Sequence, residues 1–212
     1  MVQGLNADLL LLAYARGIFP MASSREAADL HWIDPESRGI IPLDGFHISR
    51  SLARQIRRGR HEIRIDTAFE AVVRACGERP ETWINAPLFA LYQTLFRRGF
   101  AHSLEVWQDG RLTGGVFGIA LGGAFFGESM FSHAPNASKI ALAYLVERLK
   151  VGGFSLLDTQ FLTPHLASLG GIEIPRAEYR ARLATALERK GDFTGPETPA
   201  PQSILQRMTQ TS

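Results

Sequence analysis

Three consecutive strand-like runs between residues 101 and 131 are the feature that most constrains the fold of this chain. Apolar and polar residues alternate there with a period of two, as in strands with one buried face. Asp109-Gly110 separates the first two runs and favours the tight turn of a hairpin. Gly122-Gly123 separates the second run from the third. The pattern predicts an antiparallel meander of three strands, over residues 101–107, 111–121 and 124–131.

Helical spacing of apolar residues surrounds this meander. It predicts helices over residues 9–16, 50–58, 69–76, 88–96 and 136–150, a short helix from residue 163 and a last one from residue 176. Residues 154–158 form a very apolar run, as expected of a central strand. A meander followed by a helix, a strand and a helix indicates the α+β class.

The chain divides into three predicted parts. Residues 1–65 form a small N-terminal domain that carries a basic helix, and residues 21–45 within it read as irregular loops. Residues 66–190 form the main domain. Residues 191–212 are rich in Pro, Thr, Ser and Gln, so we expect a flexible tail there.

The composition excludes several classes of protein. The chain has 212 residues, of which 45% are hydrophobic and 21% charged, as in ordinary globular proteins. Cys76 is the single cysteine, which excludes an internal disulfide and a cysteine-based zinc site. The six histidines lack the usual metal-binding spacings, so we expect no metal. The apolar run of residues 9–13 is too short to cross a membrane, and we expect a cytoplasmic protein without membrane contact.

Positive charge is concentrated in one segment, although the net charge of the chain is only +2. Arg50, Arg54, Arg57 and Arg58 share one face of a predicted helix. Arginines on one face without interleaved acids repel one another, and arginine suits bidentate phosphate contacts. A solvated helix face also explains such a run, so the sequence leaves a phosphate-binding surface and a solvated face both open.

An acid interrupts the third strand of the meander. Strand alternation puts Glu128 and Met130 on one face, and an acid beside Met130 does not suit a core. Either that face lines a cleft, or the strand bulges at this point. An edge-strand acid paired with an arginine is the third possibility.

A second polar pair ends the apolar strand of residues 154–158. Asp158 and Gln160 are two residues apart and therefore share a face at the mouth of that strand, where ligands often bind. Strand-end aspartates also commonly cap the following loop. The sequence leaves both roles of Asp158 open.

A series of short motifs, taken in order, is far more specific than any one of them. The series covers about residues 9–185 and consists of Ala13-Tyr14-Ala15-Arg16-Gly17-Ile18-Phe19-Pro20, Phe46-His47-Ile48-Ser49-Arg50-Ser51-Leu52, Thr82-Trp83-Ile84, Ala101-His102-Ser103-Leu104-Glu105-Val106-Trp107, Gly114-Gly115-Val116-Phe117-Gly118, Phe126-Gly127-Glu128-Ser129-Met130-Phe131-Ser132, Asn136-Ala137-Ser138-Lys139, Asp158-Thr159-Gln160 and His165-Leu166-Ala167-Ser168-Leu169-Gly170. The series resembles the leucyl/phenylalanyl-tRNA–protein transferase family.

This resemblance implies a fold and a reaction. The fold would be acyl-CoA N-acyltransferase-like, with a mixed sheet and flanking helices behind the small N-terminal domain. The reaction would move Leu or Phe, and less readily Met, from aminoacyl-tRNA to the N-terminal amine of proteins that begin with Arg or Lys, marking them for degradation. No cofactor is implied, and we expect a monomer.

The resemblance also implies roles for particular residues. Asp158 and Gln160 would be the catalytic pair, with Glu128 beside them. The expected amino-acid pocket is Met130, Val116, Leu157 and Phe126. The expected site of the tRNA 3′-adenosine is Tyr14, Trp83 and Met21, and that of the acceptor stem is Arg50, Arg54, Arg57 and Arg58. We hypothesise that Asp158 orients Gln160 and takes a proton from the attacking amine, with orientation alone as the alternative.

Two positions depart from the family, and two other functions remain as alternatives. Met21 stands where the family often has Trp, and His31-Trp32 replaces a Trp-Trp pair. An acyl-CoA-dependent N-acyltransferase would need a glycine-rich turn at a helix N-terminus, and the chain lacks one. A non-catalytic RNA-binding module would leave the cluster of Glu128, Asp158 and Gln160 unexplained.

Overall fold

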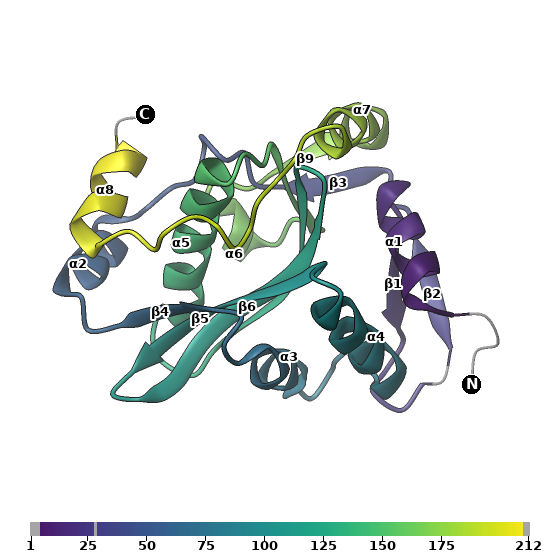
Figure 1. The fold of residues 1–212 in the computed structure, drawn as a ribbon, viewed down its shortest axis with the longest axis horizontal. Coiled ribbons are helices and arrows are strands. Elements are labelled where there is room, and N and C mark those ends of the chain that lie inside the picture. The colour runs from purple at the N-terminus through teal and green to yellow at the C-terminus, as the bar shows by residue number, and fades with distance from the viewer. Residues whose placement is uncertain (1–4, 28, 210–212) are drawn as a thin grey trace.

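A seven-stranded mixed sheet forms the centre of the molecule (Figure 1). The computed structural model describes residues 5–27 and 29–209, so our expectations for residues 1–4, 28 and 210–212 lie outside the described residues. The strand order is β4-β5-β6-β7-β8-β3-β9, and only β7 and β8 are parallel neighbours. The strands of this sheet are β3 (Ser37–Ile40), β4 (Glu62–Ile65), β5 (Ala101–Gln108), β6 (Arg111–Leu121), β7 (Ala124–Ser132), β8 (Leu156–Gln160) and β9 (Ile172–Pro175).

Helices cover both faces of this sheet, which gives a three-layer α+β architecture (Figure 1). They are α1 (Ala7–Ala15), α2 (Arg50–Arg58), α3 (Phe69–Gly77), α4 (Ala86–Arg97), α5 (Ala137–Val151), α6 (Pro164–Ala167), α7 (Arg176–Leu187) and α8 (Pro201–Thr209). One hydrophobic cluster joins the sheet to α1, α3, α4 and α7. A second cluster on the opposite face joins it to α2, α5, α6 and α8. No helix in the described ranges is long and apolar enough to cross a membrane.

The predicted meander is confirmed as strands β5, β6 and β7. Asp109 and Gly110 have φ values of +49° and +71°, the left-handed pair that a two-residue hairpin turn requires. The predicted helix after Ser49 is confirmed as α2, and the side chain of Ser49 accepts a hydrogen bond from the Leu52 amide at 3.3 Å. The apolar run near residue 156 is confirmed as an interior strand, β8.

The expectation of irregular loops over residues 21–45 is wrong. Strands β1 (Phe19–Ala22) and β2 (Leu30–Ile33) form a separate two-stranded sheet, and β3 is hydrogen-bonded between β8 and β9. Gly39 permits this insertion, since an ideal Cβ on it would lie 2.6 Å from the carbonyl carbon of Phe161. The boundary at residue 65 stays a prediction, and the large sheet has strands on both sides of it.

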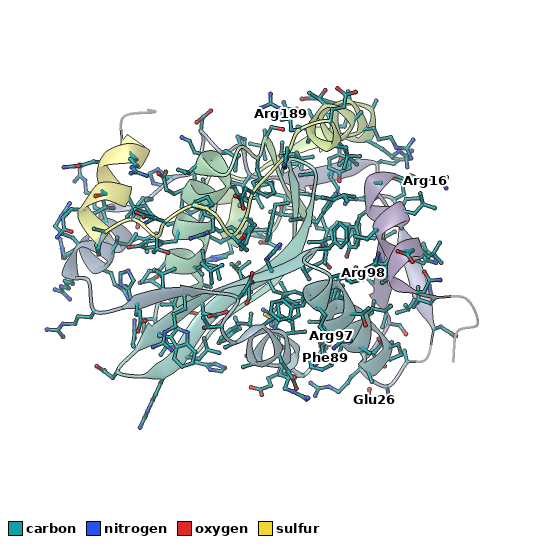
Figure 2. All side chains as sticks on the ribbon, in the orientation of Figure 1. Arg16, Glu26, Phe89, Arg97, Arg98 and Arg189 are labelled. Carbon is teal, nitrogen blue, oxygen red and sulfur yellow. The ribbon has the colours of Figure 1, made fainter. Side chains whose placement is uncertain are left out.

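Helix α1 is fastened to the main domain by a polar contact at its solvent side. Arg98, labelled in Figure 2 between α4 and α1, donates to Asp8 at 2.7 Å. On the inner side of α1, Leu10 and Tyr14 are fully buried in the first cluster. The apolar burial is the stronger attachment, because an exposed ion pair contributes little.

Residues 191–209, for which we expected a flexible tail, include a helix and pack against the core. Phe193 is 3% exposed and stacks on His102 and Phe125, with ring centroids 4.5 and 5.2 Å away. The buried guanidinium of Arg148 donates to the Phe193 carbonyl at 2.6 Å. Helix α8 packs on α2 and α5. The polar composition concealed a few apolar residues that anchor this segment.

Replacing Phe193 with alanine tests this anchoring. We expect Phe193→Ala to lower the free energy of unfolding by about 3–5 kcal/mol, because a buried aromatic ring leaves a cavity. Urea denaturation monitored by circular dichroism measures the change. Val151→Ala, at a residue that is 56% exposed, is the control and should stay within about 0.5 kcal/mol of the wild type. Equal stability of the two variants would mean that the tail is not anchored.

Candidate active site

A cavity of about 490 Å³ opens where strands β7 and β8 separate. Their parallel pairing ends at the pair Phe126 and Asp158. Beyond that pair the two strands line the cavity from opposite sides, with residues 127–132 of β7 and with Thr159 and Gln160 of β8. Unpaired strand ends at the carboxyl edge of a parallel pair are a common place for a binding site.

A β-bulge decides where Glu128 points. The β6–β7 register pairs Phe117 with Ser129 but Gly118 with Gly127, so Glu128 is the extra residue. A side chain at Gly118 would collide with the carbonyl oxygen of Phe126, which explains the glycine at the bulge. The bulge was one of the alternatives that the sequence left open. Glu128 and Met130 nevertheless both line the cavity.

Glu128 is buried among hydroxyl and amide donors. It is 6% exposed, and its Oε2 accepts from the Tyr92 hydroxyl at 2.9 Å while its Oε1 accepts from Gln160 Nε2 at 3.0 Å. Burial raises the pKa of Glu128 to about 7, against smaller lowering effects of Tyr14, Tyr92 and the charge of Arg38. Burial thus favours the neutral form of this carboxyl more than water does.

Asp158 lies in a buried ion pair. Arg38 Nε donates to its Oδ1 at 2.9 Å and Arg38 Nη2 donates to its Oδ2 at 2.6 Å. The Tyr179 hydroxyl donates to Oδ2 at 2.7 Å, and the backbone N–H of Gln160 donates to Oδ1 at 2.8 Å. Asp158 is 0% exposed and does not line the cavity. The last of these hydrogen bonds is the loop-capping role that the sequence left open.

The guanidinium of Arg38 is held from several directions. It lies 4.5 Å from the ring centroids of both Phe19 and Tyr179, and its Nη1 donates to the Gly17 carbonyl at 2.8 Å. Burial lowers the pKa of Arg38, but the hydrogen bonds and charge of Asp158 outweigh burial and raise it. The ion pair thus joins β3 and β8 to the turn after α1, to β1 and to α7.

Gln160 connects the ion pair to the cavity. Its φ of +64° is left-handed, and this conformation lets its backbone N–H reach Asp158 while its side chain reaches Glu128. Its Nε2 is committed to Glu128, and its Oε1 makes no hydrogen bond within the described part of the chain. Gln160 lines the cavity and offers this acceptor to a ligand.

Most of the predicted amino-acid pocket lines the cavity. Met130, Val116 and Leu157 are lining residues, together with Leu142 and Leu145 of α5. Phe126 is different: it is 0% exposed, belongs to the hydrophobic cluster on the opposite face, and does not line the cavity. The strand alternation on either side of the bulge separates Phe126 from Met130.

The residues expected at a terminal adenosine are only partly together. Trp83 and Met21 line the cavity. Tyr14 is 0% exposed, and its ring lies 4.9 Å from that of Phe126, so it has no surface for stacking. The Tyr14 hydroxyl has no hydrogen-bond partner of normal geometry among the described residues, although it is near enough to Glu128 to lower the pKa of that acid. Trp32 of β2 pairs with Pro20 of β1, is 43% exposed and lies outside the cavity.

The four predicted phosphate-binding arginines are all exposed on α2. Arg54 and Arg58 line a groove of about 970 Å³ between α2 and the β5–β6 hairpin, whereas Arg50 and Arg57 lie outside it. None of the four forms an ion pair with the part of the chain that the structure describes.

Sequence reasoning missed Arg38, Tyr92 and Tyr179. A buried aspartate needs a cationic partner, but the sequence has many arginines. Nothing in it indicates that the partner of Asp158 is Arg38, 120 residues away. Arg79 and His165, which also line the cavity, were missed as well. In residues 5–27 and 29–209, no group of three or more His, Cys, Asp or Glu side chains could hold a metal ion.

Glu128→Gln tests the buried carboxyl. The folded-state pKa of about 7 is above the value of 4.5 expected for an unfolded chain, so the proton stabilises the fold at low pH. We expect the unfolding free energy of the wild type, relative to Glu128→Gln, to fall by about 3 kcal/mol as the pH rises from 4.5 to about 8, through the folded-state pKa, and then to level off. Urea denaturation of both proteins across pH 4.5–8 measures this. A difference that does not change with pH would contradict the raised pKa.

The chain is similar in sequence to proteins of one known family and in fold to a solved structure. The family model described as leucyl/phenylalanyl-tRNA protein transferase matches residues 40–184, and the model of the N-terminal domain of that transferase matches residues 4–36. Proteins named leucyl/phenylalanyl-tRNA–protein transferase are 62% identical over 208 residues in Ruegeria sp. (98% of this chain, 99% of the relative) and 59% identical over 209 residues in Cereibacter sphaeroides (98% of each). The crystal structure of FemX has a similar fold, with a TM-score of 0.53 and 13% identity over 79% of this chain and 66% of FemX. The chain belongs to the leucyl/phenylalanyl-tRNA–protein transferase family.

Proposed function

We propose that this protein moves Leu or Phe, and less readily Met, from aminoacyl-tRNA to the N-terminal amine of proteins that begin with Arg or Lys. One observation carries the proposal: an apolar cavity ends at the carboxamide of Gln160 and the carboxyl of Glu128. Family membership supplies the donor and the class of reaction. The mixed sheet with its split between β7 and β8 agrees with an acyl-CoA N-acyltransferase-like fold.

The chemistry needs little beyond positioning. An aminoacyl-tRNA ester is already activated, so the reaction requires neither a covalent nucleophile nor a cofactor. An N-terminal amine has a pKa of about 7.7–8.0, so a useful fraction is neutral near pH 7. Holding the amine against the ester can lower the barrier by about 7–11 kcal/mol. Gln160 Oε1, an acceptor at the cavity wall, would receive an N–H of the attacking amine.

Asp158 positions Gln160 in this proposal and does not act as the general base. Its two oxygens already accept four hydrogen bonds, and it has no surface in the cavity. Protonating it would also break the ion pair with buried Arg38. The proton of the amine leaves to solvent or to the departing ribose oxygen.

Glu128 is the acid that can attract a basic first residue of the acceptor. It lines the cavity, and Asp158 is closed off by Arg38. A cationic side chain nearby would lower the pKa of Glu128 from about 7 and complete its ionisation. The cationic side chain of the acceptor thus stabilises the negative charge of Glu128, and that charge in turn favours acceptors that begin with Arg or Lys.

The donor fits the rest of the cavity. Val116, Met130 and Leu157 form its apolar wall, and such a wall discriminates by only about 1–3 kcal/mol per methylene, so Leu, Phe and Met can all enter. Trp83 and Met21 would contact the terminal adenosine, and the arginines of α2 would contact the acceptor stem. We propose a cytoplasmic monomer.

Transfer of labelled Leu from Leu-tRNA to a peptide beginning with Arg tests the function. We expect label in the peptide with a free amine and none in its N-acetylated form, because acetylation removes the nucleophile. A peptide beginning with Glu should be labelled much less, because Glu128 repels it. No transfer from Leu-, Phe- or Met-tRNA would overturn the proposed reaction.

Asp158→Asn separates positioning from base catalysis. We expect kcat to fall about 10²-fold, because Gln160 loses its anchor, while the pH dependence of the remaining activity stays unchanged. We also expect the unfolding free energy to fall by about 3–5 kcal/mol, since Arg38 loses its buried partner. Steady-state rates over pH 6–9 provide the measurement. If the activity of Asp158→Asn rose towards that of the wild type at high pH, where hydroxide can remove the proton, Asp158 would be the general base.

A further inference from the structure

The reactive cavity and the basic groove share a wall. Ser132 and Ser138 line the cavity, whereas Asn136 and Gln55 line the groove. The wall is therefore the turn between β7 and α5, residues 132–138, together with the middle of α2. A ligand that occupies both hollows has to cross this wall.

Hydrogen bonds hold the wall in one arrangement. Gln55 Nε2 donates to the Pro135 carbonyl at 2.9 Å, and Asn136 Nδ2 donates to Gln55 Oε1 at 2.8 Å. The Ser138 amide donates to Ser132 Oγ at 3.2 Å, and that hydroxyl donates to the Ala134 carbonyl at 2.8 Å. Because the polar groups of the wall hydrogen-bond to one another, the wall has its shape before any ligand crosses it.

The charges on either side of the wall suit a polyanion on the groove side only. The ionisable groups that line the groove are Arg54, Arg58, Arg60, His61, Glu62 and Asp109, and Glu62 is paired with Arg64 at 2.8 Å. The ionisable groups of the cavity are Arg79, Glu128 and His165. An apolar cavity with a buried acid disfavours phosphate, so the charged part of a nucleic-acid ligand belongs outside it.

Lys139 lies next to the wall. It follows Ser138 in the first turn of α5, is partly exposed, and makes no ion pair within the described part of the chain. Its charge reaches across to the cavity, where it adds to the effect of burial in lowering the pKa of His165. A cation beside the wall can neutralise a phosphate that passes over it.

We propose that the single-stranded 3′ end of the donor tRNA crosses the wall of residues 132–138, with a phosphate against Lys139. The aminoacyl ester then lies in the cavity while the paired stem lies along the groove at Arg54, Arg58 and Arg60. This inference rests on the proposed function, since it concerns the path of that donor. It makes Lys139 a positioning residue, because it contacts a phosphate and not the reacting atoms.

Lys139→Met, compared with Lys190→Met, tests the path. Both variants remove one lysine charge, and Lys190 lies beyond the end of α7, outside cavity and groove. With a donor that carries no phosphodiester, the two variants should have equal activity. We expect Lys139→Met to raise the Kd for Leu-tRNA about tenfold and to reduce the slope of log Kd against log salt by about 0.7–1. Lys190→Met should match the wild type.

A donor without phosphate gives the sharper comparison. Leucine esterified to adenosine carries the reacting ester and the terminal base but no phosphodiester. We expect the wild type and Lys139→Met to transfer Leu from this donor at equal kcat/KM. A defect of Lys139→Met with both donors would place the lysine charge in the reaction itself and overturn the proposed path.

Two further outcomes decide the matter. Equal Kd values for Lys139→Met and Lys190→Met would overturn the path while transfer by the wild type still upheld the proposed function. A larger loss of tRNA affinity in Arg79→Met, at the arginine that lines the cavity, would place the phosphates inside the cavity and also overturn the proposed path. Absence of transfer by the wild type from either donor would instead reject the proposed function.

Discussion

The buried ion pair of Arg38 and Asp158 joins positions 120 residues apart, and the arrangement of the site depends on it. Desolvating two charges costs several kcal/mol, so such a pair stabilises little by itself, but removing one partner is strongly destabilising. Here the guanidinium also lies between two aromatic rings and binds the carbonyl of Gly17. These contacts commit β3 to its place between β8 and β9.

The order imposed by that pair extends by hydrogen bonds to the cavity. Asp158 fixes the backbone of Gln160, and the carboxamide of Gln160 fixes Glu128. The two carboxylates differ in their partners: Asp158 is ion-paired with Arg38, whereas Glu128 accepts hydrogen bonds from uncharged groups and burial raises its pKa to about 7. One carboxylate therefore sets geometry, and the other remains able to respond to the charge of a substrate.

The sequence predicted what depends on local periodicity and missed what depends on single residues. The meander and α5 repeat a period over many residues, so tertiary contacts do not change them. Strand β3 has four residues, too few for a period, and its glycine matters only because Phe161 approaches it. The orientation of Glu128 stayed open in the sequence because a bulge adds one residue and reverses the alternation, and only the strand register shows the bulge. The candidate catalytic residues came from motif resemblance, whereas Arg38 as their partner could only come from the fold.

Helix α5 connects the cavity to the basic groove. Its N-terminal turn forms part of the wall between cavity and groove, and its C-terminal half holds the end of the chain, through Arg148 to Phe193 and through Glu147 to Arg207 at 2.8 Å. That terminal segment packs through α8 on α2, the helix that carries the groove arginines. Helix α2 is therefore held on two sides: Gln55 is hydrogen-bonded to the wall, and α8 of the terminal segment packs against the helix. Because the same helix lines the cavity and packs against the helix that carries the groove arginines, the separation of groove and cavity is set by packing in the core.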